Sequence, residues 1–205
     1  MPSSRLAKPQ PARRRGRPAP RPAESQPLSS VSKKPWRHQS RSAAETDRLG
    51  QALGASVREG NVVALYGELG TGKTTLVRGL AAGLGAPPGL VSSPTFVLVH
   101  EYRGRLHLAH ADLYRIESES ELRQVGLSDY LDGRHVVVVE WAERAGHELP
   151  DDRLEIRLRH RSRTTREMIV TPTGPASGAL LSKARQRWEA RDISGTRSRH
   201  PGARP

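Results

Sequence analysis

The feature that most constrains the fold is a glycine-rich loop between an apolar strand and a helix. Residues 67–74 (GELGTGKT) have the spacing Gly-x-x-x-x-Gly-Lys-Thr. The preceding residues 62–66 (VVALY) are apolar, as in a strand buried inside a parallel sheet. Residues 73–85 favour a helix that ends at a glycine, with two prolines just beyond it. This succession predicts an α/β unit in which the loop follows the carboxyl end of a buried strand.

A loop of this kind has a definite chemistry. Its backbone N–H groups form a concave nest around an anion, and its glycines permit the positive φ angles that this requires. The helix that begins near Lys73 directs its positive end at the same point. Lys73 adds a cation for the outer phosphates, and the hydroxyl group of Thr74 is a ligand for Mg²⁺. The loop therefore predicts nucleotide binding. ATP is favoured over GTP because the guanine signature Asn-Lys-x-Asp is absent from the sequence.

Two acidic residues come at the ends of predicted strands. Glu140 closes the apolar run HVVVVE, and Asp112 closes RLHLAHAD. Ligands of open α/β sheets bind beyond the carboxyl ends of the strands, and a P-loop enzyme needs a carboxylate there for Mg²⁺ or for its water shell. Either acid alone could instead cap a nearby helix. Their joint occurrence in one small domain favours a metal and catalytic role for both.

The remaining patterns complete the predicted fold. A possible capping box starts at Ser42 and begins the first helix, and a second one starts a short helix at 118–126. The other predicted elements are strands at 96–102 and 105–112, a strand at 135–141, a hairpin at 153–160 and 166–172, and a terminal helix at 179–192. Together they predict an α/β sandwich of the P-loop NTPase type, with a mostly parallel mixed sheet, flanking helices and a late β-hairpin.

Charge divides the chain into three parts. The net charge of +13 comes from residues 1–41 (+10) and 174–205 (+5), whereas residues 42–173 carry −2. We therefore expect a disordered basic Pro/Arg-rich tail, a P-loop domain over 42–173, and a basic C-terminal tail that is partly helical. The tails are expected to be solvated, with electrostatic contact to RNA as the alternative. No apolar run is long enough to span a membrane, and the absence of cysteine fits a cytoplasmic protein.

Taken together, the motifs resemble one family. The blocks GELGTGKTTLVRGLAAGLG, SSPTFVLVHEY, HADLYRI and VVVVEWAER, in this order and spacing, resemble the TsaE family of bacterial ATPases, once known as YjeE. The resemblance covers about residues 42–170. Two departures keep the acids on which the interpretation depends: His110-Ala111-Asp112 stands where HFD is common, and Glu140-Trp141-Ala142 stands where EWP is common.

The resemblance implies a set of site residues. Lys73, Asp112 and Glu140 would be catalytic, with Asp112 positioning or activating the attacking water. Thr74 and Glu140 would bind Mg²⁺. The residues implied to contact ATP are Ser42, Glu68, Leu69, Gly70, Thr71, Gly72, Lys73, Thr74, Thr75, Thr95, Trp141 and Arg166. Among these, Thr95 would lie on a segment that senses the nucleotide, and Trp141 would support the site.

The resemblance also implies a role. Members of the family support the synthesis of N6-threonylcarbamoyladenosine in tRNA by binding a TsaB–TsaD complex and cycling it through ATP binding and hydrolysis, so that contact with tRNA is indirect. Two alternatives follow from the residues themselves. One is a small-molecule kinase with the arginines of 157–166 as a phosphate clamp, although residues 142–152 are too few for a helical lid. The other is an RNA-binding protein that uses its basic tails.

Overall fold

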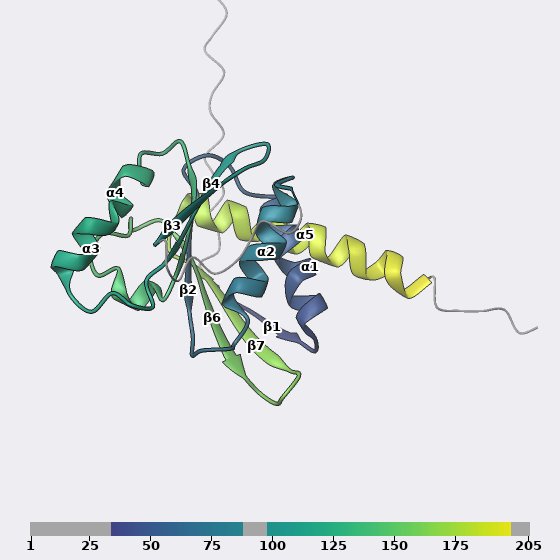
Figure 1. Cartoon of the computed structure of the whole chain (residues 1–205). Coiled ribbons are helices and arrows are strands. Elements are labelled where there is room, and N and C mark those ends of the chain that lie inside the picture. Colours follow the sequence, from purple (N-terminus) through teal and green to yellow (C-terminus); the bar gives the residue numbers. More distant parts are fainter. Residues whose placement is uncertain (1–33, 88–97, 198–205) are drawn as a thin grey trace, which may run out of the picture.

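The protein forms one seven-stranded mixed sheet with helices on both faces (Figure 1). A computed structural model describes residues 34–87 and 98–197. The elements are β1 (Trp36–Ser40), α1 (Ala43–Gly54), β2 (Val62–Tyr66), α2 (Lys73–Gly83), β3 (Val99–Arg103), β4 (His107–Asp112), α3 (Glu119–Val125), α4 (Leu127–Tyr130), β5 (Val136–Glu140), η1 (Ala142–Arg144), β6 (Leu154–His160), β7 (Arg166–Pro172) and α5 (Pro175–Arg197). Within these ranges no helix is long and apolar enough to cross a membrane.

The strand order explains why the sheet is mixed. It runs β1-β7-β6-β2-β5-β4-β3, with parallel pairing from β6 through β2 and β5 to β4. The hairpins β3–β4 and β6–β7 and the edge pair β1–β7 are antiparallel. The predicted P-loop NTPase-like sheet with a late hairpin is confirmed. Parallel pairing brings the carboxyl ends of β2, β5 and β4 to one edge, where the glycine-rich loop begins.

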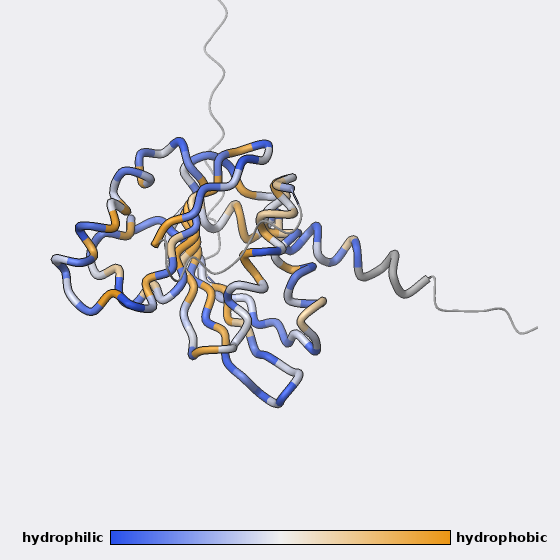
Figure 2. Tube along the Cα trace, in the orientation of Figure 1, coloured by the Kyte–Doolittle hydropathy of each residue, from blue (hydrophilic) through white to orange (hydrophobic). Residues whose placement is uncertain are grey.

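The two faces of the sheet are covered differently. One face packs against α1, α2 and α5 in a core to which all seven strands contribute. Strand β3 contributes Tyr102, and β1 contributes the partly buried Trp36. The other face packs against α3, α4 and η1, and the strand residues of this second core come from β2, β4 and β5. Figure 1 shows these two helical layers on opposite sides of the sheet, and Figure 2 shows the apolar strands between them. No residue of β1, β6 or β7 belongs to the second core among the described residues.

Helices α1 and α2 touch through their backbones. Gly50 and Gly54 on α1 face Gly79 and Gly83 on α2, each pair four residues apart and so on one side of its helix. A methyl group added to Gly54 would overlap the carbonyl oxygen of Leu80. A methyl group added to any of the other three glycines would likewise overlap a backbone carbonyl oxygen of the facing helix. This contact fixes α2, whose first turn follows the glycine-rich loop, directly against α1.

Order extends beyond both boundaries predicted from composition. Strand β1 precedes Ser42 and pairs with β7, so the sheet begins within the segment predicted to be a tail. Its five residues WRHQS include one aliphatic or aromatic anchor, Trp36, which packs at the first core together with Trp188 of α5. Helix α5 begins earlier and ends later than predicted. Its earlier start is supported by Asp152, which accepts hydrogen bonds from the backbone N–H groups of Ala176 and Ser177 in its first turn.

Candidate functional site

The glycine-rich loop has the geometry of an anion nest. Gly70 and Gly72 have φ angles of 76° and 102°, which glycine adopts without strain, and Gly72 leads directly into the first turn of α2. A side chain at Gly67 would overlap the carbonyl oxygen of Leu158 on β6. The loop is therefore held close to the sheet, and its backbone N–H groups gather at the positive end of the α2 dipole.

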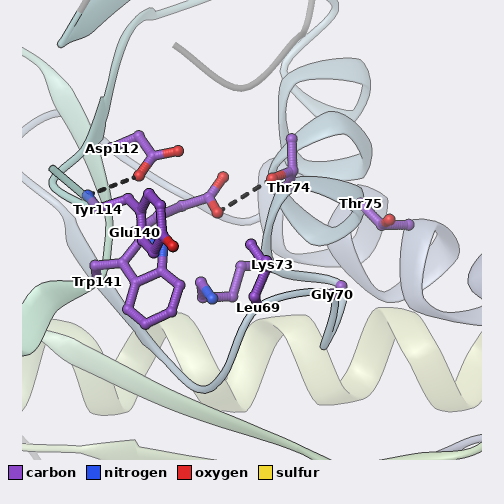
Figure 3. A pocket seen from close by; sticks show the side chains of 10 residues that line it. Leu69, Gly70, Lys73, Thr74, Thr75, Asp112, Tyr114, Glu140 and Trp141 are labelled. Carbon is purple, nitrogen blue, oxygen red and sulfur yellow. Dashed lines mark hydrogen bonds between the residues drawn. The ribbon is translucent and has the colours of Figure 1, made fainter. Parts of the chain in front are cut away.

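Lys73 lies folded over its own loop. Its Nζ donates hydrogen bonds to the carbonyl oxygens of Gly67 at 2.6 Å and Glu68 at 3.0 Å. The same ammonium group lies 3.8 Å from the centroid of the Trp141 ring (Figure 3). Burial lowers the pKa of Lys73, and the nearby carboxylates, led by Glu140, oppose this shift. A multiply charged anion would compete with these neutral carbonyls for the ammonium group.

Thr74 and Glu140 form the next part of the site. The Thr74 hydroxyl donates a hydrogen bond to Glu140 Oε2 at 3.1 Å, so the first turn of α2 meets the carboxyl end of β5. The other carboxylate oxygen, Oε1, lies 2.9 Å from Nε2 of His110. A carboxylate only accepts, so this ring nitrogen carries the proton. Both residues of the His110–Glu140 pair are almost fully buried, and Nδ1 of His110 has no hydrogen-bond partner within residues 34–87 and 98–197.

Asp112 lies beside Glu140 on the neighbouring strand. Each acid ends its strand, as the sequence indicated, and the two are paired in register where β4 and β5 end. Asp112 is buried, and its Oδ1 accepts a hydrogen bond from the backbone N–H of Tyr114 at 3.0 Å (Figure 3). This bond holds the turn after β4 and fixes the carboxylate at the edge of the sheet.

Trp141 occupies a strained position directly after Glu140. Its φ angle of 57° is left-handed, and it is the one non-glycine residue with a positive φ in the part of the chain that the structure describes. Its ring contacts that of Tyr114, with centroids 4.9 Å apart, and the guanidinium of Arg144 lies 6.0 Å from it. Trp141 thus lies between the ammonium group of Lys73 and the turn that follows Asp112.

These residues surround a cavity of about 300 Å³ at the N-terminal end of α2. Its lining residues are Leu69, Gly70, Gly72, Lys73, Thr74, Thr75, Asp112, Tyr114, Glu140 and Trp141 (Figure 3). Glu68 and Thr71, also predicted to contact the ligand, line a second cavity on the β6 side of the loop. Thr95 lies outside the described residues, so its predicted role stays a prediction.

Two other predicted residues lie beside the glycine-rich loop on β7 and at the start of α1. The Nε of Arg166, at the start of β7, donates a hydrogen bond to the carbonyl oxygen of Thr71 at 3.1 Å and lies beside Gly72. Ser42 caps α1 through a hydrogen bond from Glu45 N, and Thr46 one turn later also approaches Gly72. Neither Ser42 nor Arg166 lines the cavity, although α1 and β7 both border the loop near Gly72.

The sequence patterns missed two residues of the site. His110 has no metal-ligand spacing with cysteine or aspartate, so the sequence pattern alone marks it as an ordinary strand residue. Its position two residues before Asp112 was the available signal, since residues i and i+2 of a strand share a face. Tyr114 is also part of the cavity wall and is partly exposed. Its role depends on a turn whose direction the sequence pattern did not indicate.

This geometry can be compared with that of known proteins. The sequence model of one family, described as threonylcarbamoyl adenosine biosynthesis protein TsaE, matches residues 40–168, which is more than half of the chain. The chain belongs to the TsaE family. The matched region extends from the last residue of β1 to the third residue of β7, and it includes the whole loop, both acidic residues and β6. Helix α5 follows the matched region.

Curated relatives carry the name tRNA threonylcarbamoyladenosine biosynthesis protein TsaE. One from Treponema pallidum is 44% identical over 131 residues, which are 64% of this chain and 96% of the relative. One from Bacillus subtilis is 41% identical over 63% of this chain and 81% of the relative. One from Streptomyces coelicolor is 41% identical over 71% of this chain and 95% of the relative. The crystal structure of Bacillus subtilis YdiB is 30% identical, with a TM-score of 0.63 over 75% of this chain and 95% of that one.

Proposed function

We propose that this protein is a Mg²⁺-dependent ATPase that supports the formation of N6-threonylcarbamoyladenosine in tRNA. The observation that carries the proposal is the meeting of four side chains at the first turn of α2: Lys73 and Thr74 from the helix, and Asp112 and Glu140 from adjacent strand ends. A cation, a hydroxyl group and two carboxylates beside a nest of N–H groups are the parts that phosphoryl transfer from ATP requires.

The site suits a triphosphate and a hard cation. The cavity of about 300 Å³ is small for a whole nucleotide, so we assign it to the phosphates and place the base toward Ser42 and Arg166. Lys73 would exchange the Gly67 and Glu68 carbonyls for the outer phosphate oxygens. The hydroxyl group of Thr74 and the carboxylate of Glu140 already lie together, and Mg²⁺ prefers such oxygen ligands alongside phosphates and water.

The proposed reaction is hydrolysis. Water attacks the γ-phosphorus, the bond from that phosphorus to the β–γ bridging oxygen breaks, and ADP and phosphate are released. Asp112 holds the attacking water and takes up its proton. Lys73 stabilises the negative charge on the phosphate oxygens, while Trp141 screens the ammonium group from solvent. Mg²⁺, when bound, supplies further charge neutralisation at the β- and γ-phosphates.

The partner is proposed to be a TsaB–TsaD complex in the cytoplasm, with ATP binding and hydrolysis cycling the assembly. The names of the curated relatives support the pathway, and the family match supports assigning this chain to it. Residues 142–152, where a small-molecule kinase would need a lid, contain one 3₁₀ turn and no α-helix. This favours hydrolysis over transfer to a small acceptor.

Substitution of Lys73 by alanine tests the proposal. Lys73→Ala removes the phosphate cation, so we expect loss of nucleotide binding in calorimetry and of phosphate release in a steady-state assay. Arg78→Ala, an exposed position on the same helix, is the matched control and is expected to behave as wild type. ATPase activity that persists unchanged in Lys73→Ala would remove the basis of the site assignment.

The partner claim needs its own measurement. The purified chain is mixed with TsaB and TsaD from its host, and complex formation is followed by size-exclusion chromatography with ATP, with ADP and without nucleotide. We expect the complex to depend on ATP and to be lost in Lys73→Ala. A complex that forms equally in all three conditions would contradict nucleotide-driven cycling.

A further inference from the structure

Within residues 34–87 and 98–197, no helix or loop covers half of one sheet face. On the side of α3, α4 and η1, the apolar core reaches β2, β5 and β4 and stops there. The same side of β6, β7 and β1 carries alternating residues that are exposed or half-buried. Such a bare surface is normal for an antiparallel sheet only if its side chains are polar. Here three of the eight strand residues on this side are arginines, Arg37, Arg157 and Arg159, and the other five are Gln39, Glu155, Glu167, Ile169 and Thr171.

The register aligns these side chains in rows across the strands. Arg157 of β6 lies opposite Ile169 of β7, which lies opposite Arg37 of β1. Arg159 lies opposite Glu167 in the next row. Residues two apart along β6 are about 7 Å from one another, so guanidinium groups repeat along the strand. Arg161 and Arg163 extend this row of arginines into the turn after β6. We call Arg37, Arg153, Arg157, Arg159, Arg161 and Arg163, with Glu155 and Glu167, the arginine face.

Positive charge on the arginine face exceeds the negative charge available to pair with it. Glu155 accepts from both Arg153 and Arg157, and Glu167 pairs with both Arg37 and Arg161. Each glutamate thus serves two arginines. Arg159 and Arg163 are exposed and form no ion pair with any residue of 34–87 or 98–191. The face therefore has excess positive charge, and two of its guanidinium groups are available to an outside anion.

Charge excludes two occupants of this face. Residues 1–33 hold eight Lys/Arg and one acidic residue, and 198–205 hold two arginines and no acid, so this chain's own ends are repelled. A second copy that presents the same face is repelled for the same reason. The occupant must be an external molecule that carries many negative charges.

The composition of the face distinguishes RNA from an acidic protein. Stable protein interfaces are built around a buried apolar or aromatic anchor. The large hydrophobic side chains that are exposed within the described residues, Leu69 and Tyr114, both lie at the nucleotide cavity and not on this face. Interfaces with nucleic acid are more polar and far more positive, and arginine binds phosphate in a bidentate manner. We propose that the arginine face binds the phosphate backbone of an RNA directly, in contrast to the indirect contact that the family resemblance implies, and the proposed function supplies tRNA as that RNA.

The face leads directly to the glycine-rich loop. Arg157 and Arg159 line the second cavity, of about 590 Å³, together with Glu68 and Thr71 of that loop. Arg157 also lies over the Tyr66 ring, 4.2 Å from its centroid, at the strand end from which the loop starts. Glu68 and Glu143 bound the cavity and would repel a phosphate, so the RNA backbone is confined to β6 and its turn. RNA bound there would lie next to the segment that holds ATP.

The test uses the full chain and the two arginines that have no ion pair. Arg159→Gln/Arg163→Gln removes two phosphate contacts and breaks no ion pair among the described residues. Arg58→Gln/Arg187→Gln, at exposed positions away from the face, has the same net charge and is the control. Binding of a fluorescent unmodified tRNA transcript is measured by anisotropy between 50 and 300 mM salt. The first variant should weaken binding roughly tenfold more than the control and lower the salt slope by about 1–2.

Three other outcomes would overturn the inference. Equal losses in both variants would show that the binding depends on net charge or on the tails. Absence of tRNA binding by the wild type would show that the face is not an RNA site. Unchanged tRNA binding combined with lost binding to TsaB–TsaD would make the face a protein site. The rate of ATP hydrolysis is measured in parallel and should be the same in both variants as in the wild type. Failure of the proposed ATPase function would appear separately, as absence of ATP hydrolysis by the wild type.

Discussion

The backbone contact between α1 and α2 gives a prediction whose size can be worked out. Gly54→Ala adds one methyl group, and alanine favours a helix over glycine by about 1 kcal/mol. The added methyl group would nevertheless overlap the Leu80 carbonyl and would also lie 3.0 Å from the Cα of Gly83. Neither obstacle is a side chain that could rotate away. The two helices would have to separate, so we expect overpacking at or above the upper end of the usual range of about 1–3 kcal/mol.

The net effect should therefore be a loss of about 2–3 kcal/mol in the free energy of unfolding, after the gain in helix propensity is subtracted. For a domain of this size that corresponds to a fall in Tm of roughly 4–12 °C. Differential scanning calorimetry measures it directly. Arg48→Ala, an exposed position on α1, is the control and should change stability by less than about 0.5 kcal/mol. A Tm for Gly54→Ala equal to or above that of wild type would refute the backbone contact.

Three further substitutions test other parts of the structure. His110→Ala removes the donor to Glu140 and should raise the Mg²⁺ concentration for half-maximal ATP hydrolysis about 10–100-fold. His110→Gln should raise this concentration less, and an equal rise in both variants would argue against the hydrogen bond. Trp36→Ala should lower the free energy of unfolding, measured by urea denaturation, by about 2 kcal/mol, because it removes the aromatic contact of β1 with the core. An unchanged free energy of unfolding would mean that this contact of β1 does not stabilise the domain. Ser118→Ala should speed amide exchange in α3 by removing a cap of about 1 kcal/mol, and unchanged exchange would exclude the capping box.

The predictable part of the molecule is the part encoded by local patterns. Residues 62–66 were predicted as a strand, and β2 has those bounds. The hairpin at 153–160 and 166–172 agrees with β6 and β7 to within one residue, because alternation of apolar and polar residues follows directly from having one buried face. The positions of Asp112 and Glu140 at adjacent strand ends also followed, since parallel strands end at a common edge.

What the sequence did not indicate depends on contacts between distant segments. Strand β1 is short and polar, and its pairing with β7 becomes visible only once the sheet is assembled. The hydrogen bond from His110 to Glu140 spans 30 residues and depends on the register of β4 against β5. The N-terminal end of α5 likewise depends on Asp152, which lies before the β6–β7 hairpin. No spacing rule within one segment encodes such pairings.

The left-handed backbone at Trp141 has a consequence for the shape of the site. This conformation costs a non-glycine residue about 1–2 kcal/mol, and it bends the chain away as soon as β5 ends. Were Trp141 extended, β5 would run on past Glu140, and main chain would fill the volume in front of α2. A small amount of backbone strain at Trp141, offset by the folding energy of the rest of the domain, thus keeps main chain out of that volume.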